Sequence, residues 1–290
     1  DGDWSSDVCS SDLATSLLPL VLFPATGAVS PGNTASPYAS SIIFLFIGGF
    51  LIAVAIQRWG LHRRIALHTI AAVGTKPDRI ILGFMVATAF LSMWVSNTAT
   101  VVMMTPIGLA VVRQVSGIVE GSGVEVPVGR GEFGFGTALM LCIAYSASVG
   151  GVGTLIGTPP NVVFAGAARE IYGQDISFLD WMMYGVPVAV IGVAGVWLYV
   201  VKFAHRPRID SIPGGLDIVR DEIDELGAMS REERLVLGVF GVTALAWILR
   251  SFVINRFLPG VDDSTVAVAG ALLLFLIPAR DEDGERTALL

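Results

Sequence analysis

The chain has 290 residues with 53% hydrophobic and 15% charged side chains, a mean hydropathy of +0.71 and a formal charge of −7. Soluble domains carry about 25% charged residues, so this composition excludes a single water-soluble core of this length, and it also excludes a disordered chain. It predicts an all-α polytopic membrane protein, in which the 33 glycines allow close contacts between helices.

The first thirteen residues do not fit this composition. Residues 3–13 read DWSSDVCSSDL and have neither the basic start nor the apolar run of a signal peptide. They resemble the in-frame translation of a sequencing-library adapter, so we interpret residues 1–13 as a non-native leader. Without its four acidic residues the formal charge is −3. Without Cys9 only Cys142 remains, and one cysteine makes neither a disulfide framework nor a metal site.

Six apolar stretches approach or reach the length of about 20 residues that crosses a bilayer. They cover residues 14–31, 39–57, 134–156, 178–203, 232–252 and 264–278. Residues 80–112 differ, because their 33 positions hold no charge and are interrupted at Ser96-Asn97-Thr98. Two full spans need about 40 residues, whereas one needs about 20. Two half-length helices that meet at a polar tip fit best, and we predict a re-entrant hairpin at residues 80–113.

The basic residues test this hairpin, because cytoplasmic loops are enriched in Lys and Arg. With both hairpin ends on one side, only Arg169, Arg250 and Arg256 fall outside. The 15 on the inner side are Arg58, Arg63, Arg64, Lys76, Arg79, Arg113, Arg130, Lys202, Arg206, Arg208, Arg220, Arg231, Arg234, Arg280 and Arg286. A single crossing would give a split of 8 to 10. The pattern favours the hairpin in a multi-pass protein of the inner (plasma) membrane.

The segments between the spans are interpreted as connectors. Residues 58–79 are amphipathic and predict a helix along the inner membrane surface. In the second connector, Ser230 and Glu233 have the spacing of a capping box. The predicted organisation is a leader (1–13), scaffold-type helices with an interfacial helix (14–79), the hairpin (80–113), a transport region with a broken helix (134–203), a cytoplasmic connector (204–231) and further scaffold-type helices (232–290).

The hairpin tip, residues 92–100 (SMWVSNTAT), is the first candidate site. Ser92 and Ser96 would share one helix face, and Asn97 and Thr98 would break the helix by bonding to their own backbone. The carbonyl end of a broken helix favours a small cation, and the amide end favours an anion. The alternative is that these hydroxyls only cap or join helices.

The second candidate is residues 146–163, which read SASVGGVGTLIGTPPNVV. Its glycines and the pair Pro159-Pro160 cannot continue a regular helix, so we predict a second broken span. A phosphate-binding loop is excluded, because no strand precedes the glycines and no lysine follows them. A glycine packing face is the alternative, but it leaves the segment 158–161 unexplained. Two broken helices point to a binding site where they meet.

Both candidate segments lack charged residues and histidine in their apolar cores. A proton relay, a metal centre or a membrane-embedded enzyme would need such groups, so we expect no enzyme and no resident cofactor. Hydroxyl, amide and carbonyl oxygens suit sodium, and helix N-termini suit a carboxylate or a sulfate. The expected partners are therefore a small anion, sodium ions and membrane lipid, with no nucleic acid.

The pair of motifs SNTAT (residues 96–100) and IGTPPN (residues 156–161) resembles the divalent anion/sodium symporter (DASS) family of dicarboxylate, citrate and sulfate carriers. Further matches are LPLVLFP (18–24), FLFIGGF (44–50), LHRRIALH (61–68) and ELGAMSREER (225–234). The resemblance implies a sodium site formed by Ser92, Ser96, Asn97 and Gly157. It implies an anion site formed by Ser96, Asn97, Thr98, Thr158, Pro159 and Pro160.

The resemblance further implies a homodimer that moves its site across the membrane like an elevator and is built from two inverted repeats. This chain holds one SNT motif, so we interpret it as the first repeat of a longer protein, truncated at both ends. The expected function is sodium-coupled symport of a C4-dicarboxylate such as succinate. The alternatives are a sulfate, citrate or arsenite carrier of the same superfamily, or a non-transporting membrane scaffold subunit.

Overall fold

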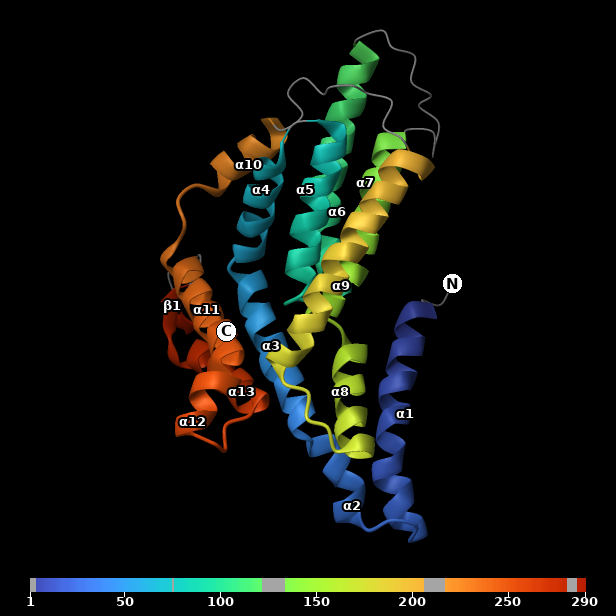
Figure 1. Cartoon of the computed structure of the whole chain (residues 1–290), viewed down its shortest axis with the longest axis vertical. Coiled ribbons are helices and arrows are strands. Elements are labelled where there is room, and N and C mark those ends of the chain that lie inside the picture. The colour runs from blue at the N-terminus through green and yellow to red at the C-terminus, as the bar shows by residue number, and fades with distance from the viewer. Residues whose placement is uncertain (1–3, 75, 122–133, 206–216, 281–285) are drawn as a thin grey trace. The chain divides into compact units, whose positions relative to one another are not determined.

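The computed structural model of the protein is mostly helical and describes residues 4–74, 76–121, 134–205, 217–280 and 286–290 (Figure 1). It divides into two units, one that extends to Phe44 and one that begins at Leu45. Residues 206–216 of the predicted connector lie outside the described residues, as do three arginines of the predicted inner side, Arg130, Arg206 and Arg208.

The first unit contains α1 (Trp4–Thr26), α2 (Pro31–Ala35) and the 3-10 turn η1 (Ser36–Ala39). Helix α1 therefore begins within the predicted leader. The helix ends five residues before the predicted end of the first span, and the next residue, Gly27, has a φ of +72°, a conformation that glycine adopts readily. The Tyr38 hydroxyl donates to the carbonyl of Ser16 at 2.5 Å and fastens η1 to α1.

Eleven further α-helices are described after this unit, the first of which crosses the boundary, together with the 3-10 turn η2 (Gly151–Gly153) and the π-helical turns η3 (Val200–Ala204) and η4 (Arg250–Ile254). The α-helices are α3 (Ser41–Arg58), α4 (Leu61–Val73), α5 (Pro77–Ser92), α6 (Asn97–Gly121), α7 (Gly134–Gly150), α8 (Pro159–Tyr172), α9 (Phe178–Tyr199), α10 (Asp217–Leu226), α11 (Arg231–Leu249), α12 (Asn255–Phe257) and α13 (Asp263–Leu276). Five helical stretches among the described residues are long and apolar enough to cross a bilayer. They are Pro31–Arg58, Asn97–Ser116, Gly134–Gly153, Phe178–Ala204 and Arg231–Phe257.

Helix α7 is the centre of the second unit, because α5, α6 and α9 all pack against it (Figure 1). Phe84 of α5 and Phe135 and Leu139 of α7 are fully buried in this core. A glycine allows the closest approach: a Cβ at Gly150 would lie 2.4 Å from the Cα of Ala89. The core therefore holds the two arms of the predicted hairpin against α7 by apolar burial.

The predicted capping box at the start of α11 is confirmed. The Ser230 hydroxyl accepts from the backbone N–H of Glu233 at 3.0 Å, and the Glu233 carboxylate accepts from the Ser230 N–H at 2.7 Å. Ser177 and Asp180 form the same motif at the start of α9. These caps satisfy amide groups that a helix start leaves unpaired, which fixes where both helices begin.

The prediction of two half-length hairpin arms is wrong for the second arm. Helix α6 has 25 residues, and its stretch Asn97–Ser116 is long and apolar enough to cross a bilayer. The helix continues past the charge of Arg113 because this side chain is exposed, while Val111 and Val115 on either side of it stay buried.

The prediction of an all-α fold misses one short antiparallel pair, β1 (Pro278–Arg280) and β2 (Arg286–Ala288). Helix α13 ends before Pro278, because proline has no N–H to continue the helix. The backbone N–H of the buried Leu289 then donates to the carbonyl of Leu274 at 3.1 Å. The segment after α13 thus folds back onto the end of that helix.

Candidate functional site

The hairpin tip is a gap between two helices, α5 ending at Ser92 and α6 beginning at Asn97. The expectation that Ser92 and Ser96 share a helix face is therefore wrong, and Asn97 and Thr98 begin a helix instead of breaking one. Ser96 caps α6: its hydroxyl accepts from the Ala99 N–H at 3.4 Å. Only four residues separate the two helices. The carbonyl of the last of them, Ser96, accepts the first backbone hydrogen bond of α6, from the Thr100 N–H at 3.0 Å.

Three oxygen atoms meet at the end of α5. The hydroxyl of Ser92, which is fully buried, lies 2.7 Å from the side-chain oxygen of Asn97 and 2.7 Å from the carbonyl oxygen of Ala147. One hydroxyl hydrogen can be donated to only one of these two acceptors at a time. Ala147 belongs to the last turn of α7, the end of the helix that carries partial negative charge. Such a set of oxygens suits a small hard cation.

The glycine loop between α7 and α8 lies directly against this tip. A Cβ at Gly151 would lie 2.3 Å from the side-chain oxygen of Asn97, so the asparagine occupies the space a side chain would need. A Cβ at Gly157 would lie 2.4 Å from the carbonyl oxygen of Gly151. Of the four predicted sodium-site residues, Asn97 and Gly157 thus lie against Gly151, and Ser92 bonds to Asn97.

Two residues absent from the predicted site fasten the loop. The Thr154 hydroxyl donates to the backbone carbonyl of Met93 and ties the loop to the hairpin tip. The side-chain amide of Asn161 donates to the carbonyls of Gly151 at 2.9 Å and Thr154 at 2.7 Å. Asn161 ends the motif TPPN, so its sequence signal was present, whereas nothing in the sequence marked Thr154.

The residues predicted to bind the anion lie at two helix N-termini. Thr158 immediately precedes α8, and Pro159 and Pro160 open it, where missing N–H groups are tolerated. Thr98, Pro159 and Pro160 are exposed, and Ser96, Asn97 and Thr158 are half-buried. Within the described ranges no hydrogen bond joins the tip residues 96–98 to residues 158–160. Their joint role in anion binding stays a prediction.

The hairpin tip and the loop between α7 and α8 form a junction of four helix ends, and these ends determine its electrostatics. The C-terminal ends of α5 and α7 bring partial negative charge, and the N-terminal ends of α6 and α8 bring partial positive charge. None of the residues at this junction named above carries a formal charge. Among the residues that the structure describes, no group of three or more His, Cys, Asp or Glu side chains could hold a metal ion. The polar groups that this arrangement offers are oxygen atoms and amide groups without formal charge.

Replacing Gly157 with alanine should destabilise this loop by about 1–3 kcal/mol, the usual effect of overpacking. The added Cβ would meet the backbone of Gly151, which cannot rotate away as a side chain can. The matched control is Gly195→Ala in α9, where a Cβ would meet nothing within 4 Å. Thermal unfolding in detergent should show a lower midpoint for Gly157→Ala only, and equal midpoints would contradict the close packing.

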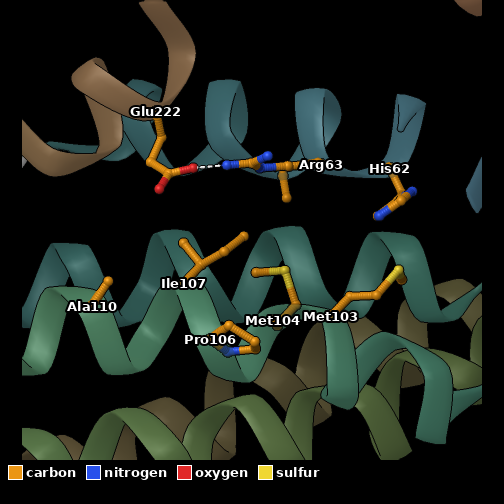
Figure 2. Close-up of a pocket in the computed structure, with 9 residues that line it drawn as sticks. His62, Arg63, Met103, Met104, Pro106, Ile107, Ala110 and Glu222 are labelled. Atoms are coloured by element: carbon orange, nitrogen blue, oxygen red, sulfur yellow. Dashed lines mark hydrogen bonds and ion pairs between the residues drawn. The ribbon is translucent and has the colours of Figure 1, made fainter. Parts of the chain in front are cut away.

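A separate groove of about 240 Å³ lies between α4, α6 and α10 (Figure 2). An ion pair between Arg63 of α4 and Glu222 of α10 forms one edge, and methionines of α6 line the opposite wall. Burial lowers the pKa of His62, although the bond from its Nδ1 to the carbonyl of Ile56 at 3.1 Å acts in the opposite direction. The groove contains none of the predicted site residues, and its ion pair fastens the connector helix to α4.

Comparison with known proteins gives one consistent result. The family model described as "Sodium:sulfate symporter transmembrane region" matches residues 9–283. The sodium-dependent dicarboxylate transporter SdcS of Staphylococcus saprophyticus is 43% identical over 272 residues, which is 93% of this chain and 52% of that protein. SdcS of Staphylococcus aureus strain NCTC 8325 is 41% identical over 275 residues, 94% of this chain and 52% of that protein. The chain thus spans about half the length of these curated relatives.

Proposed function

We propose that this chain, which belongs to the sodium:sulfate symporter family and is a multi-pass membrane protein, carries one half of a site that couples sodium entry to anion transport. The carrying observation is the charge-free junction at which Asn97 and Gly157 lie against Gly151 and Ser92 bonds to Asn97. Oxygen atoms are gathered there without a neighbouring acid or base. This favours binding of sodium and its co-transported anion over acid–base chemistry.

Sodium binds first in this mechanism, because its ligands come from both the hairpin tip and the loop between α7 and α8 and so hold these two segments together. The oxygens of Ser92, Ser96 and Asn97 and the carbonyl region of Gly157 receive the ion. Binding orders the hairpin tip, and the amide end of α6 then faces the anion. Ser96, Asn97 and Thr98 from the tip and Thr158, Pro159 and Pro160 from the start of α8 contribute to the anion site.

The proposed substrate is a C4-dicarboxylate such as succinate. The names of the Staphylococcus relatives support a dicarboxylate, and the family name keeps sulfate as an alternative. Citrate and arsenite are further alternatives within the wider superfamily, and a scaffold subunit would transport nothing. Homodimer formation and an elevator-like movement belong to the same proposal, and their support is the family resemblance.

The deciding experiment is uptake of labelled succinate into vesicles by a chimaera. In it this chain replaces the matching half of the S. saprophyticus relative, so the missing half-site is supplied. An inward sodium gradient should drive uptake, and unlabelled succinate should compete better than sulfate, citrate or arsenite. Uptake that ignores the sodium gradient would refute coupling, and better competition by sulfate would reassign the substrate. A chimaera that inserts but transports nothing would favour the scaffold alternative.

A further inference from the structure

The loop between α7 and α8 has its backbone carbonyls divided into two groups. The carbonyls of Gly151 and Thr154 accept from the side-chain amide of Asn161. The carbonyl of Val152 accepts from the indole N–H of Trp181 at 2.8 Å. Each of these three carbonyls therefore has at least one lone pair engaged by an N–H donor of the protein itself, which reduces its availability to an ion.

The other carbonyls of the loop are different. In the described portion of the chain, no hydrogen-bond donor reaches the carbonyl oxygens of Gly153, Leu155, Ile156 and Gly157. Among these four, Gly157 is the residue that packs against Gly151, and Gly151 in turn lies against the side chain of Asn97. A carbonyl that accepts no hydrogen bond has both of its lone pairs available to a cation.

We propose that Asn161 is a positioning residue of the sodium site, an inference that rests on the proposed function. Asn161 is 6% exposed, and both hydrogens of its amide are used on the loop, so its nitrogen has nothing left to offer a ligand. It acts through Gly151 and Thr154, whose carbonyls it turns away from the ion. The carbonyl of Gly157 is thereby kept for sodium.

This position also links the two halves of the proposed site. Asn161 lies in the first turn of α8, directly after Pro159-Pro160, so it joins the sodium-side loop to the helix end proposed for the anion. Thr154, which Asn161 holds by its carbonyl, bonds through its hydroxyl to the hairpin tip. A change in the loop on sodium binding would therefore move the start of α8 as well.

Asparagine is the side chain that this geometry requires. Aspartate has the same shape but donates no hydrogen when ionised, so it would place negative charge against two carbonyl oxygens. When protonated, it regains one donor. Serine also keeps one donor, whereas alanine keeps none. Alanine leaves the carbonyl of Gly151 without its donor and the carbonyl of Thr154 with only the N–H of Gly157. The expected order of sodium affinity is therefore asparagine, then serine, then alanine and ionised aspartate.

The test measures sodium binding by the purified chain in detergent, as the rise of the thermal unfolding midpoint with NaCl when choline chloride keeps the ionic strength constant. The Asn161→Asp variant should need about tenfold more sodium for the half-maximal rise, equivalent to about 1.4 kcal/mol. Lowering the pH should recover part of this loss, because a protonated carboxyl donates again. Asn255→Ala, which removes another partly buried amide outside the loop, is the matched control and should bind like the wild type.

Each result decides something. Unchanged sodium affinity in Asn161→Asp, with a normal wild-type response, would overturn the positioning role and leave the proposed function standing. If the thermal unfolding midpoint of the wild-type chain does not rise with sodium, the sodium site itself is overturned, and this inference with it. If Asn161→Asp does not fold, Asn161→Ser decides, and wild-type affinity in that variant would overturn the proposal.

Discussion

Replacing Asn97 with alanine should abolish sodium-coupled succinate uptake by the chimaera, with a loss of about 100-fold or more, equivalent to at least about 2.8 kcal/mol. The substitution removes the oxygen that lies 2.7 Å from the Ser92 hydroxyl and the side chain that packs on Gly151. It therefore removes one proposed sodium ligand and also the contact that holds the loop against the tip. Among the predicted residues, Asn97 alone contacts both Ser92 and Gly151 and also belongs to both the proposed sodium site and the proposed anion site.

The control for this experiment is Asn33→Ala, an exposed asparagine of α2 in the first unit. It should transport like the wild-type chimaera, which shows that losing an asparagine amide is not in itself harmful. The readout is initial uptake at several sodium concentrations, with insertion of each variant checked by membrane fractionation. Sodium-driven uptake at the wild-type level in Asn97→Ala would remove Asn97 from the site.

The helices were largely predictable because local chemistry sets their ends. Apolar runs place α3, α7, α9, α11 and α13, and the ends of the last three lie close to caps or prolines that the sequence displays. The length of α6 was not predictable from charge alone. Arg113 ends the uncharged run, but the helix continues because its buried residues keep their helical spacing.

The candidate site was predictable in its side chains and not in its backbone. Ser92, Asn97 and Gly157 stand in motifs that can be recognised, whereas the role of a carbonyl such as that of Ala147 depends on where a helix ends. Likewise, the sequence does not distinguish Gly151 from the neighbouring glycines. Only the approach of Asn97, which is 54 positions earlier in the chain, shows why a side chain would not fit there.

The second large effect concerns stability, at a buried ion pair outside the proposed sodium and anion sites. The Nε of Arg250 lies 2.6 Å from a carboxylate oxygen of Asp263, and both side chains are about nine-tenths buried. The same carboxylate accepts from the backbone N–H of Phe178 at 2.8 Å, so it joins the start of α9 to α11 and α13. The stacked rings of Phe178 and Trp247, with centroids 4.5 Å apart, cover this junction.

Replacing Asp263 with alanine should lower the free energy of unfolding by about 3–5 kcal/mol, because it leaves the guanidinium of Arg250 buried without a partner. Denaturant unfolding of the purified chain in detergent measures this loss. The double variant Arg250→Met, Asp263→Ala should recover part of the stability, since no unpaired charge remains. Recovery cannot be complete, because the N–H of Phe178 still lacks its acceptor. If Asp263→Ala unfolds at the same denaturant concentration as the wild type, the ion pair does not join these helices.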